Sequence, residues 1–186
     1  GKGMSGGEII IRPREEETYV WKDNTIAGNT CLYGATGGHL FVGGCVGERF
    51  GVRNSGAIAV VEGLGDHACE YMTGGLIVSL GGSGSNFGAG MSGGLAFVYD
   101  EDDHFENNYN PEMVGIERLS DSGEVDALKK IVEAHATATL SPHASSLLEN
   151  WERTVSKFWK AVPHPSSPHS PKNVLKRGSL NIAVRT

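Results

Sequence analysis

A short phrase that joins a hydroxyl residue to a glycine pair recurs along the first half of the chain at a nearly fixed spacing. "MTGGLIV" begins at Met72, and "MSGGLAF" begins at Met91, nineteen residues later. Five copies align on the second residue of each pair, with gaps of 31, 19, 18 and 19 residues. A fixed period of this size indicates a solenoid, in which each repeat stacks on the next. The anchors are Gly7, Gly38, Ala57, Gly75 and Gly94.

The two positions before each anchor also form columns. The first column is always glycine and the second is always serine or threonine, and the 31-residue gap predicts an insertion over residues 13–26. We expect each glycine pair to form a corner, where positive φ is tolerated, and the hydroxyls to bond along the stack. These corner residues are Gly6, Gly37, Gly56, Gly74 and Gly93, preceded by Ser5, Thr36, Ser55, Thr73 and Ser92.

The repeat unit cannot be helical. Glycine supplies 24 of the first 94 residues, and each glycine destabilises a helix interior by about 1 kcal/mol. The runs after the anchors, such as "HLFV", "AIAVV" and "LIVSL", are short, apolar and partly β-branched, which favours strands. A unit of this length traces roughly 60 Å of extended chain, enough for one complete coil. The sequence therefore predicts an all-β solenoid, a parallel β-helix, over residues 1–100.

Side chains alternate along a strand, so the strand columns divide between two faces. The second and fourth positions after the anchor, which include Leu40 and Val42, are assigned to the lumen. The third position lies on the outer face and is also wholly apolar, so either the C-terminal region or another domain must cover it. We predict this outer column as a docking face; its members are Ile10, Phe41, Val60, Val78 and Phe97.

Composition excludes several classes of protein. A net charge of −6 and the lack of a basic stripe argue against nucleic acid as a partner. Residues 71–99 carry no charge, but nine of these 29 are glycine and the apolar runs are short, so no membrane span is expected. Three cysteines without CxxC spacing indicate a reducing compartment. The chain opens inside a repeat, which we interpret as a piece of a longer polypeptide whose targeting region is missing.

The second half of the chain predicts a different organisation. Residues 101–120 are interpreted as an acidic exit loop and 121–162 as a helical pair. Asp121 is placed to cap the first helix, and Ser141 with Pro142 is placed to start the second. The apolar spacing of the second helix is followed as far as Val162. Residues 163–186 are rich in proline and then basic, which predicts a disordered tail.

No group of residues makes a convincing catalytic, cofactor or metal site. Asp66, His67 and Glu70 could be metal ligands or an acid–base set, but a polar corner that satisfies backbone groups is favoured. We do not expect His67 and Glu70 to meet, because they lie three apart on a β-coil, and Arg53 is expected to pair with Glu70. The glycine-rich run 81–90 lacks the ending of a phosphate loop. Cys31, Cys45 and Cys69 fit no cluster spacing and are interpreted as small core residues.

The phrases "GNTCLYGATGG", "GDHACEYMTGG" and "FGAGMSGGLAFVYDED" resemble the C-terminal (GXGXG-repeat) domain of the glutamate synthase large chain. The resemblance continues through "LKKIVEAHATATLSPHASSLLENWERTVSKFWKAVP" and covers residues 1–162. It implies a right-handed β-helix within a parent enzyme of several domains. In that parent an amidotransferase domain hydrolyses glutamine, and ammonia passes to a synthase domain that carries FMN and an iron–sulfur cluster and forms glutamate from 2-oxoglutarate.

The family's catalytic residues and cofactor ligands lie in those other domains, so none is carried onto this chain. The leading hypothesis is a non-catalytic scaffold that holds the amidotransferase and FMN domains in register, in a cytoplasmic or plastid enzyme dependent on ferredoxin or NAD(P)H. A stand-alone β-helix interaction protein is the alternative. A β-helix enzyme acting on polysaccharide ranks last, because Arg53, Asp66 and Glu70 are its only candidate residues.

Overall fold

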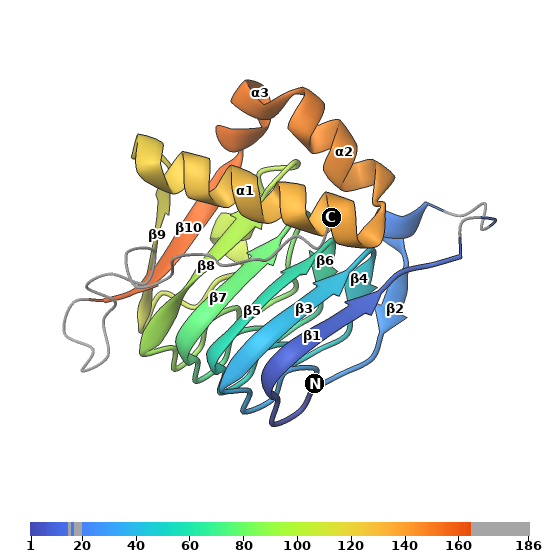
Figure 1. The fold of residues 1–186 in the computed structure, drawn as a ribbon. Helices are drawn as coiled ribbons and strands as arrows, with labels where there is room; N and C mark the ends of the chain where they lie inside the picture. The colour runs from blue at the N-terminus through green and yellow to red at the C-terminus, as the bar shows by residue number, and fades with distance from the viewer. Residues whose placement is uncertain (15, 17–19, 165–186) are drawn as a thin grey trace.

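A computed structural model describes residues 1–14, 16 and 20–164, and Figure 1 shows its strands stacked as successive coils. The coils make a β-solenoid of about four turns, followed by helices. The first part contains β1 (Ser5–Ile11), η1 (Trp21–Asp23), β2 (Thr25–Ala27), β3 (Gly37–Val42), β4 (Cys45–Val46), β5 (Ser55–Val61), β6 (Gly63–Leu64), β7 (Thr73–Ser79) and β8 (Gly93–Tyr99). The second contains η2 (Phe105–Asn107), β9 (Val114–Arg118), α1 (Ser122–Thr139), α2 (Pro142–Glu149), α3 (Trp151–Val155) and β10 (Phe158–Pro163).

The long strands form one seven-stranded sheet in the order β1-β3-β5-β7-β8-β10-β9, and the short strands form a second sheet in the order β2-β4-β6. Strands β1, β3, β5, β7 and β8 pair in parallel, one coil to the next, so that Ala59 lies beside Leu40 and Ile77. This register confirms the repeat alignment. The glycine pairs lie at the start of the long strands, where the register shifts between Ser55 and Ile58 and again between Thr73 and Leu76.

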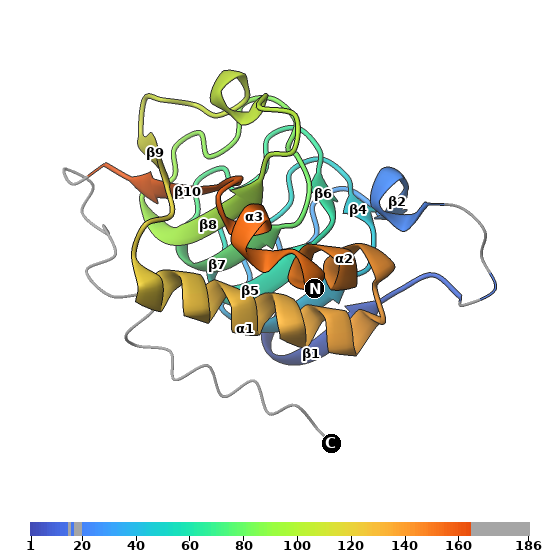
Figure 2. The same cartoon turned by 90° about the horizontal axis from the view of Figure 1, so that it is seen from above.

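Two apolar layers lie on the two faces of the long sheet. The lumen holds the second and fourth columns after the anchor, including Leu40, Val42, Ile77 and Val98. The outer layer contains Phe97 and its column neighbours, packed against Leu128, Ile131 and Val132 of α1 and Phe158 of β10. Figures 1 and 2 show α1 running across the strands with α2 and α3 beside it.

The chain's own C-terminal region therefore covers most of the predicted docking face. Phe41, Val60, Val78 and Phe97 are buried in the outer layer. Ile10, on the edge strand β1, is the exception and stays 44% exposed. Of the two covers considered for this column, the C-terminal region is thus the one observed for these four positions.

The predicted helix starts are confirmed. Asp121 Oδ1 accepts a hydrogen bond from the backbone N–H of Glu124 at 2.9 Å. Ser141 Oγ accepts one from Ala144 N at 3.0 Å, with Pro142 in the first turn of α2. Side-chain caps of this kind satisfy backbone donors that a helix leaves unpaired.

The extent of the second helix was predicted wrongly. The helical segment ends in the short α3, and residues 158–163 form β10, which pairs antiparallel with both β8 and β9. Phe158 packs in the outer layer and Ala161 in the lumen layer, which is the alternation of a strand. The last coil would otherwise leave the edge of β8 unpaired, and β10 satisfies it.

The segment predicted as an exit loop also contains secondary structure. The 3-10 helix η2 and strand β9 both lie within residues 101–120. Strand β9 pairs with β10 from Val114 to Arg118 and completes the end of the long sheet. The predicted tail 163–186 lies outside the described residues from position 165 onward.

Truncating Phe97 tests whether the outer column is core. We expect Phe97→Ala to lower the free energy of unfolding by about 3–5 kcal/mol, because the ring is fully buried between sheet and helices. The matched control is Ile10→Ala in the same column, for which a loss below about 1 kcal/mol is expected because half of the side chain already meets water. Urea unfolding followed by circular dichroism measures both, and equal losses would contradict the layer assignment.

Candidate functional site

The corner that precedes each long strand depends on close contact between coils. A Cβ atom built on Gly56 would lie 2.2 Å from the carbonyl oxygen of Thr36, and one on Gly74 would lie 2.3 Å from that of Ser55. Real Cβ atoms do not approach backbone oxygens so closely, so these positions require glycine. The hydroxyls of Thr36 and Ser55 donate to carbonyls of the preceding coil, Met4 O at 3.5 Å and Ala35 O at 3.3 Å.

The anchors of this corner use positive φ wherever they are glycine. Gly38 and Gly75 have φ of 96° and 81°. The Ala57 coil differs, because the buried side chain of Asn54 accepts hydrogen bonds from Gly56 N and Ala57 N and donates to Ala57 O. An asparagine side chain thereby supplies the turn that glycine supplies elsewhere.

A second corner repeats a left-handed backbone conformation in every coil. Its residues are fixed by backbone bonds between coils, such as Arg49 N to Asp66 O at 2.8 Å and His67 N to Ser85 O at 2.9 Å. Residues other than glycine adopt this conformation rarely, so the stacking must hold it in place. Three columns share it, namely Thr30, Arg49, His67 and Asn86; Leu32, Gly51, Cys69 and Gly88; and Gly34, Arg53, Tyr71 and Gly90.

This backbone brings His67 and Glu70 together, contrary to our expectation. His67 Nδ1 lies 2.8 Å from Glu70 Oε1, because left-handed residues at 67, 69 and 71 wind the chain more tightly than a strand. Asn86 Nδ2 donates to the same oxygen at 3.1 Å. The predicted pair of Arg53 with Glu70 was wrong at the side-chain level, since among the described residues only Arg53 N bonds to Glu70 O, at 2.9 Å.

Asp66 acts as the polar corner residue that the sequence favoured. Its Oδ1 accepts a hydrogen bond from the backbone N–H of Ser85 on the next coil at 2.7 Å. A Cβ atom on Gly84 would lie 2.1 Å from that oxygen. The glycine-rich run 81–90 therefore fits the close stacking of coils and begins no helix.

Among the described residues, no group of three or more His, Cys, Asp and Glu side chains is arranged to hold a metal ion. The described cysteines are free thiols, and Cys69 is buried in the lumen layer. Burial raises the pKa of Cys69, and burial together with Glu62 and Asp23 raises the pKa of Cys45 to about 11. Both thiols are therefore protonated at neutral pH and are poor nucleophiles.

A groove of about 490 Å³ lies where the long strands turn toward the short sheet. Its lining combines backbone from the glycine-rich corners with side chains that include Lys22, Cys45, Asp100 and His143. Lys22 Nζ lies 3.5 Å from Asp23 Oδ1 and 3.9 Å from Glu101 Oε2. Such exposed pairs contribute little stability, so Lys22 is not tightly fixed in the groove.

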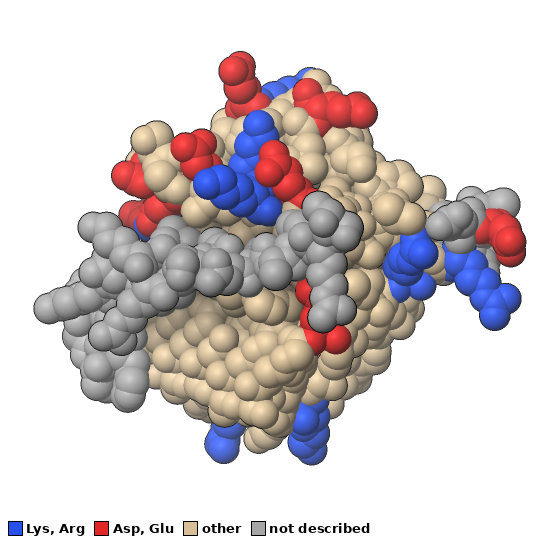
Figure 3. Space-filling view, in the orientation of Figure 1, with Lys and Arg blue, Asp and Glu red and all other residues tan. Residues whose placement is uncertain are grey.

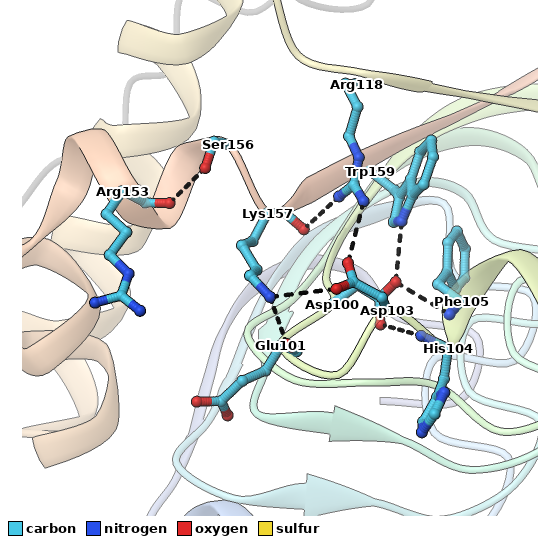
Figure 4. Close-up of polar contacts among 10 residues, drawn as sticks. All are labelled: Asp100, Glu101, Asp103, His104, Phe105, Arg118, Arg153, Ser156, Lys157 and Trp159. Atoms are coloured by element: carbon cyan, nitrogen blue, oxygen red, sulfur yellow. Dashed lines mark hydrogen bonds and ion pairs between the residues drawn. The ribbon is translucent and has the colours of Figure 1, made fainter.

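Asp100 at the end of the coils organises the loop beside this groove (Figure 4). Its carboxylate is buried and accepts hydrogen bonds from His104 N at 2.9 Å, Phe105 N at 3.1 Å and Trp159 Nε1 at 3.0 Å. Arg118 stacks on Trp159 with its guanidinium 3.7 Å from the ring centre. These contacts join the loop to β9 and β10, so this acidic segment has a structural use.

Lys157 and Arg118 extend the same cluster. Lys157 Nζ donates to Glu101 O at 2.6 Å, and Arg118 donates to Lys157 O at 3.0 Å. Asp103 lies within 3.5 Å of both cations. This network could not be found from the sequence, because its members are separated by up to 59 residues and meet only through strand pairing.

Comparison with known proteins identifies the family. The GXGXG motif family model matches residues 1–164. The chain belongs to the GXGXG motif family. Within that family it is 52% identical over 172 residues to ferredoxin-dependent glutamate synthase 2 of Synechocystis sp., 92% of this chain and 11% of the relative. It is also 52% identical over 172 residues to the chloroplastic ferredoxin-dependent glutamate synthase of Spinacia oleracea.

A relative named for a different reductant matches equally well. The NADPH glutamate synthase large chain of Azospirillum brasilense is 53% identical over 163 residues, 88% of this chain and 11% of the relative. This GXGXG chain thus spans about a tenth of the length of the glutamate synthases it matches. None of its described helices is long and apolar enough to cross a membrane.

Replacing Asp100 tests the loop anchor. We expect Asp100→Ala to lower the free energy of unfolding by about 3 kcal/mol, because three donors lose a buried acceptor. Asp102→Ala, an exposed acid in the same loop, is the control and should change stability by less than about 0.5 kcal/mol. Urea unfolding followed by circular dichroism measures both variants, and an unchanged midpoint for Asp100→Ala would contradict the anchoring role.

Proposed function

We propose that this chain is the non-catalytic β-helix module of a glutamate synthase, which forms two glutamates from glutamine, 2-oxoglutarate and reductant. One observation supports the proposal. About half of the aligned residues are identical to those of glutamate synthases that are roughly ten times longer, over most of this chain. The module holds the amidotransferase and FMN synthase domains of the same polypeptide in register. The coil is proposed to be right-handed, as the family resemblance implies.

The chemistry of the parent enzyme lies elsewhere in this proposal. FMN and the iron–sulfur cluster are bound by other domains, and no residue of this module is assigned to catalysis. Relatives named for ferredoxin and for NADPH match equally, so the likeness favours neither electron donor. We propose a cytoplasmic or plastid location for the parent.

The docking face of the module must lie outside the layer already covered by α1. Ile10 on β1 is the member of the predicted face that remains exposed, and the neighbouring Ser5, Gly6 and Gly7 of β1 are exposed too. In Figure 3 the coils below α1 carry few charged side chains, and charges gather over the helices. We propose that the catalytic domains pack against the β1 side of the coils, with Ile10 in the contact.

The size of the native polypeptide tests the scaffold proposal. An antibody raised against residues 1–164 should detect a band far above 19.7 kDa in extract of the source cells. The immunoprecipitate should form glutamate from glutamine and 2-oxoglutarate, whereas the purified 186-residue chain should hydrolyse no glutamine and bind no flavin. A band near 19.7 kDa would support the stand-alone interaction protein, and turnover by the purified chain would refute a purely structural role.

A further inference from the structure

Three polar side chains from separate elements meet in the apolar layer between the coils and the helices. Glu62 comes from the corner between β5 and β6, His135 from the last part of α1, and Ser141 from the start of α2. Each of the three residues is at most 1% exposed. Titratable side chains are rarely buried so fully unless they are well paired.

The pairing in this cluster is incomplete. Ser141 Oγ donates to Glu62 Oε1 while it caps α2, and His135 Nε2 lies 3.5 Å from the same Glu62 oxygen. The other atoms, Glu62 Oε2 and His135 Nδ1, are buried without a hydrogen-bond partner among the described residues. One corner of the coil therefore holds both sides of the α1–α2 junction, through a contact that is only partly satisfied.

The histidine can be accommodated in this cluster only when it is neutral. A proton on His135 would create a second N–H at Nδ1, which has no acceptor among the described residues. Burial accordingly lowers the pKa of His135, and the nearby Glu62 only partly offsets this effect. The packed α1–α2 junction disfavours a proton on His135. Acid must therefore either destabilise this junction or open it to water.

The other titratable groups around His135 do not supply the missing acceptor. His143 of α2 lies near enough to lower the pKa of His135 further, and its own Nε2 bonds to Leu80 O at 2.7 Å. On β3, His39 stacks on Phe41, and the Phe41 ring lies 6.0 Å from that of His135. Cys45, near Glu62, remains a neutral thiol at the pH values concerned.

We propose that the α1–α2 junction is a proton-operated latch, in which uptake of one proton by His135 releases the junction from the coil corner while the coils stay folded. The strands are paired coil to coil and do not depend on this contact, whereas the junction is held by Glu62 and by the bond from His143 to Leu80 O. Glu62 and Leu80 also line the groove. Opening the latch therefore changes the groove wall and uncovers Phe41.

The sign of the pH dependence follows from proton linkage. The open junction has an ordinary histidine, with a pKa near 6.5, and the closed junction has a histidine with a lowered pKa. The stability that neutral His135 gives the closed state is fully present above pH 6.5 and is lost as the pH falls through the lowered pKa. Between these two values the opening constant should rise about tenfold per pH unit, because opening takes up one proton.

Native-state amide hydrogen exchange on the full 186-residue chain tests the latch. After correction for intrinsic exchange rates, amides in the last two turns of α1 and the first turn of α2 should lose protection with this slope below pH 6.5. Amides of β5 and β7 should show no such slope. A junction whose protection is independent of pH, or strands that lose protection in parallel with it, would overturn the proposal.

Three variants identify the group that takes up the proton. In His135→Gln the slope at the junction should vanish. In Glu62→Gln the slope should begin at the same pH but continue to lower pH, because the carboxylate that favours a charged histidine in the closed state is gone. His67→Gln, which removes another histidine next to a glutamate, should keep the slope. A slope that persists in His135→Gln, or one that is lost in His143→Gln, would contradict the assignment to His135.

A direct titration keeps the proposal testable if His135→Gln does not fold. The pH dependence of the His135 ring signals in the unmodified chain, followed by NMR, should give a pKa below 6.5. A pKa at or above 6.5 would rule out the latch.

Discussion

The contact between glycine backbone on one coil and carbonyl oxygens on the coil below is the constraint on which the structure depends. Where Gly56 passes over Thr36 O and Gly74 over Ser55 O, there is no space for a side chain. The coils can therefore stack at strand spacing, and each long strand then pairs with the next along its length. Without this contact the lumen columns could not come into register, and the left-handed corner would lose the inter-coil bonds that hold it.

Parallel stacking has a second consequence, because it leaves a sheet that is apolar on both faces. Parallel sheets are normally covered on both sides. Here the lumen covers one face, and α1 with α2 covers the other. The polar contacts of Glu62 and Asp100 then fix this cover at the α1–α2 junction and at the end of the coils. The helices and the outer face of the coils thus share one apolar layer, whereas the pairing of the long strands runs from coil to coil.

The sequence allowed the coils to be predicted well because each column repeats with its neighbours in contact. Leu40, Ala59 and Ile77 fall in the lumen as the alignment required. Strand β10 was missed because helical spacing was extended past α3. In the structure Phe158 and Val162 face the outer layer, and Trp159 and Ala161 face the lumen layer. The left-handed columns were missed because Arg49, His67 and Tyr71 give no local signal for positive φ. Their conformation is imposed by the neighbouring coils.

The polar contacts of the candidate site are of two kinds, those that repeat from coil to coil and those that occur once. Repeated positions such as Asp66 satisfy backbone groups of the next coil. The unique polar residues, Glu62, Asp100 and His135, all lie where the helices or the final strands meet the coils. A repeat can stack only on another repeat, so wherever the chain leaves the solenoid it needs contacts that occur once. Those contacts carry the buried carboxylates and the buried histidine, and for this reason the response of the chain to pH is expected at the junctions rather than within the coils.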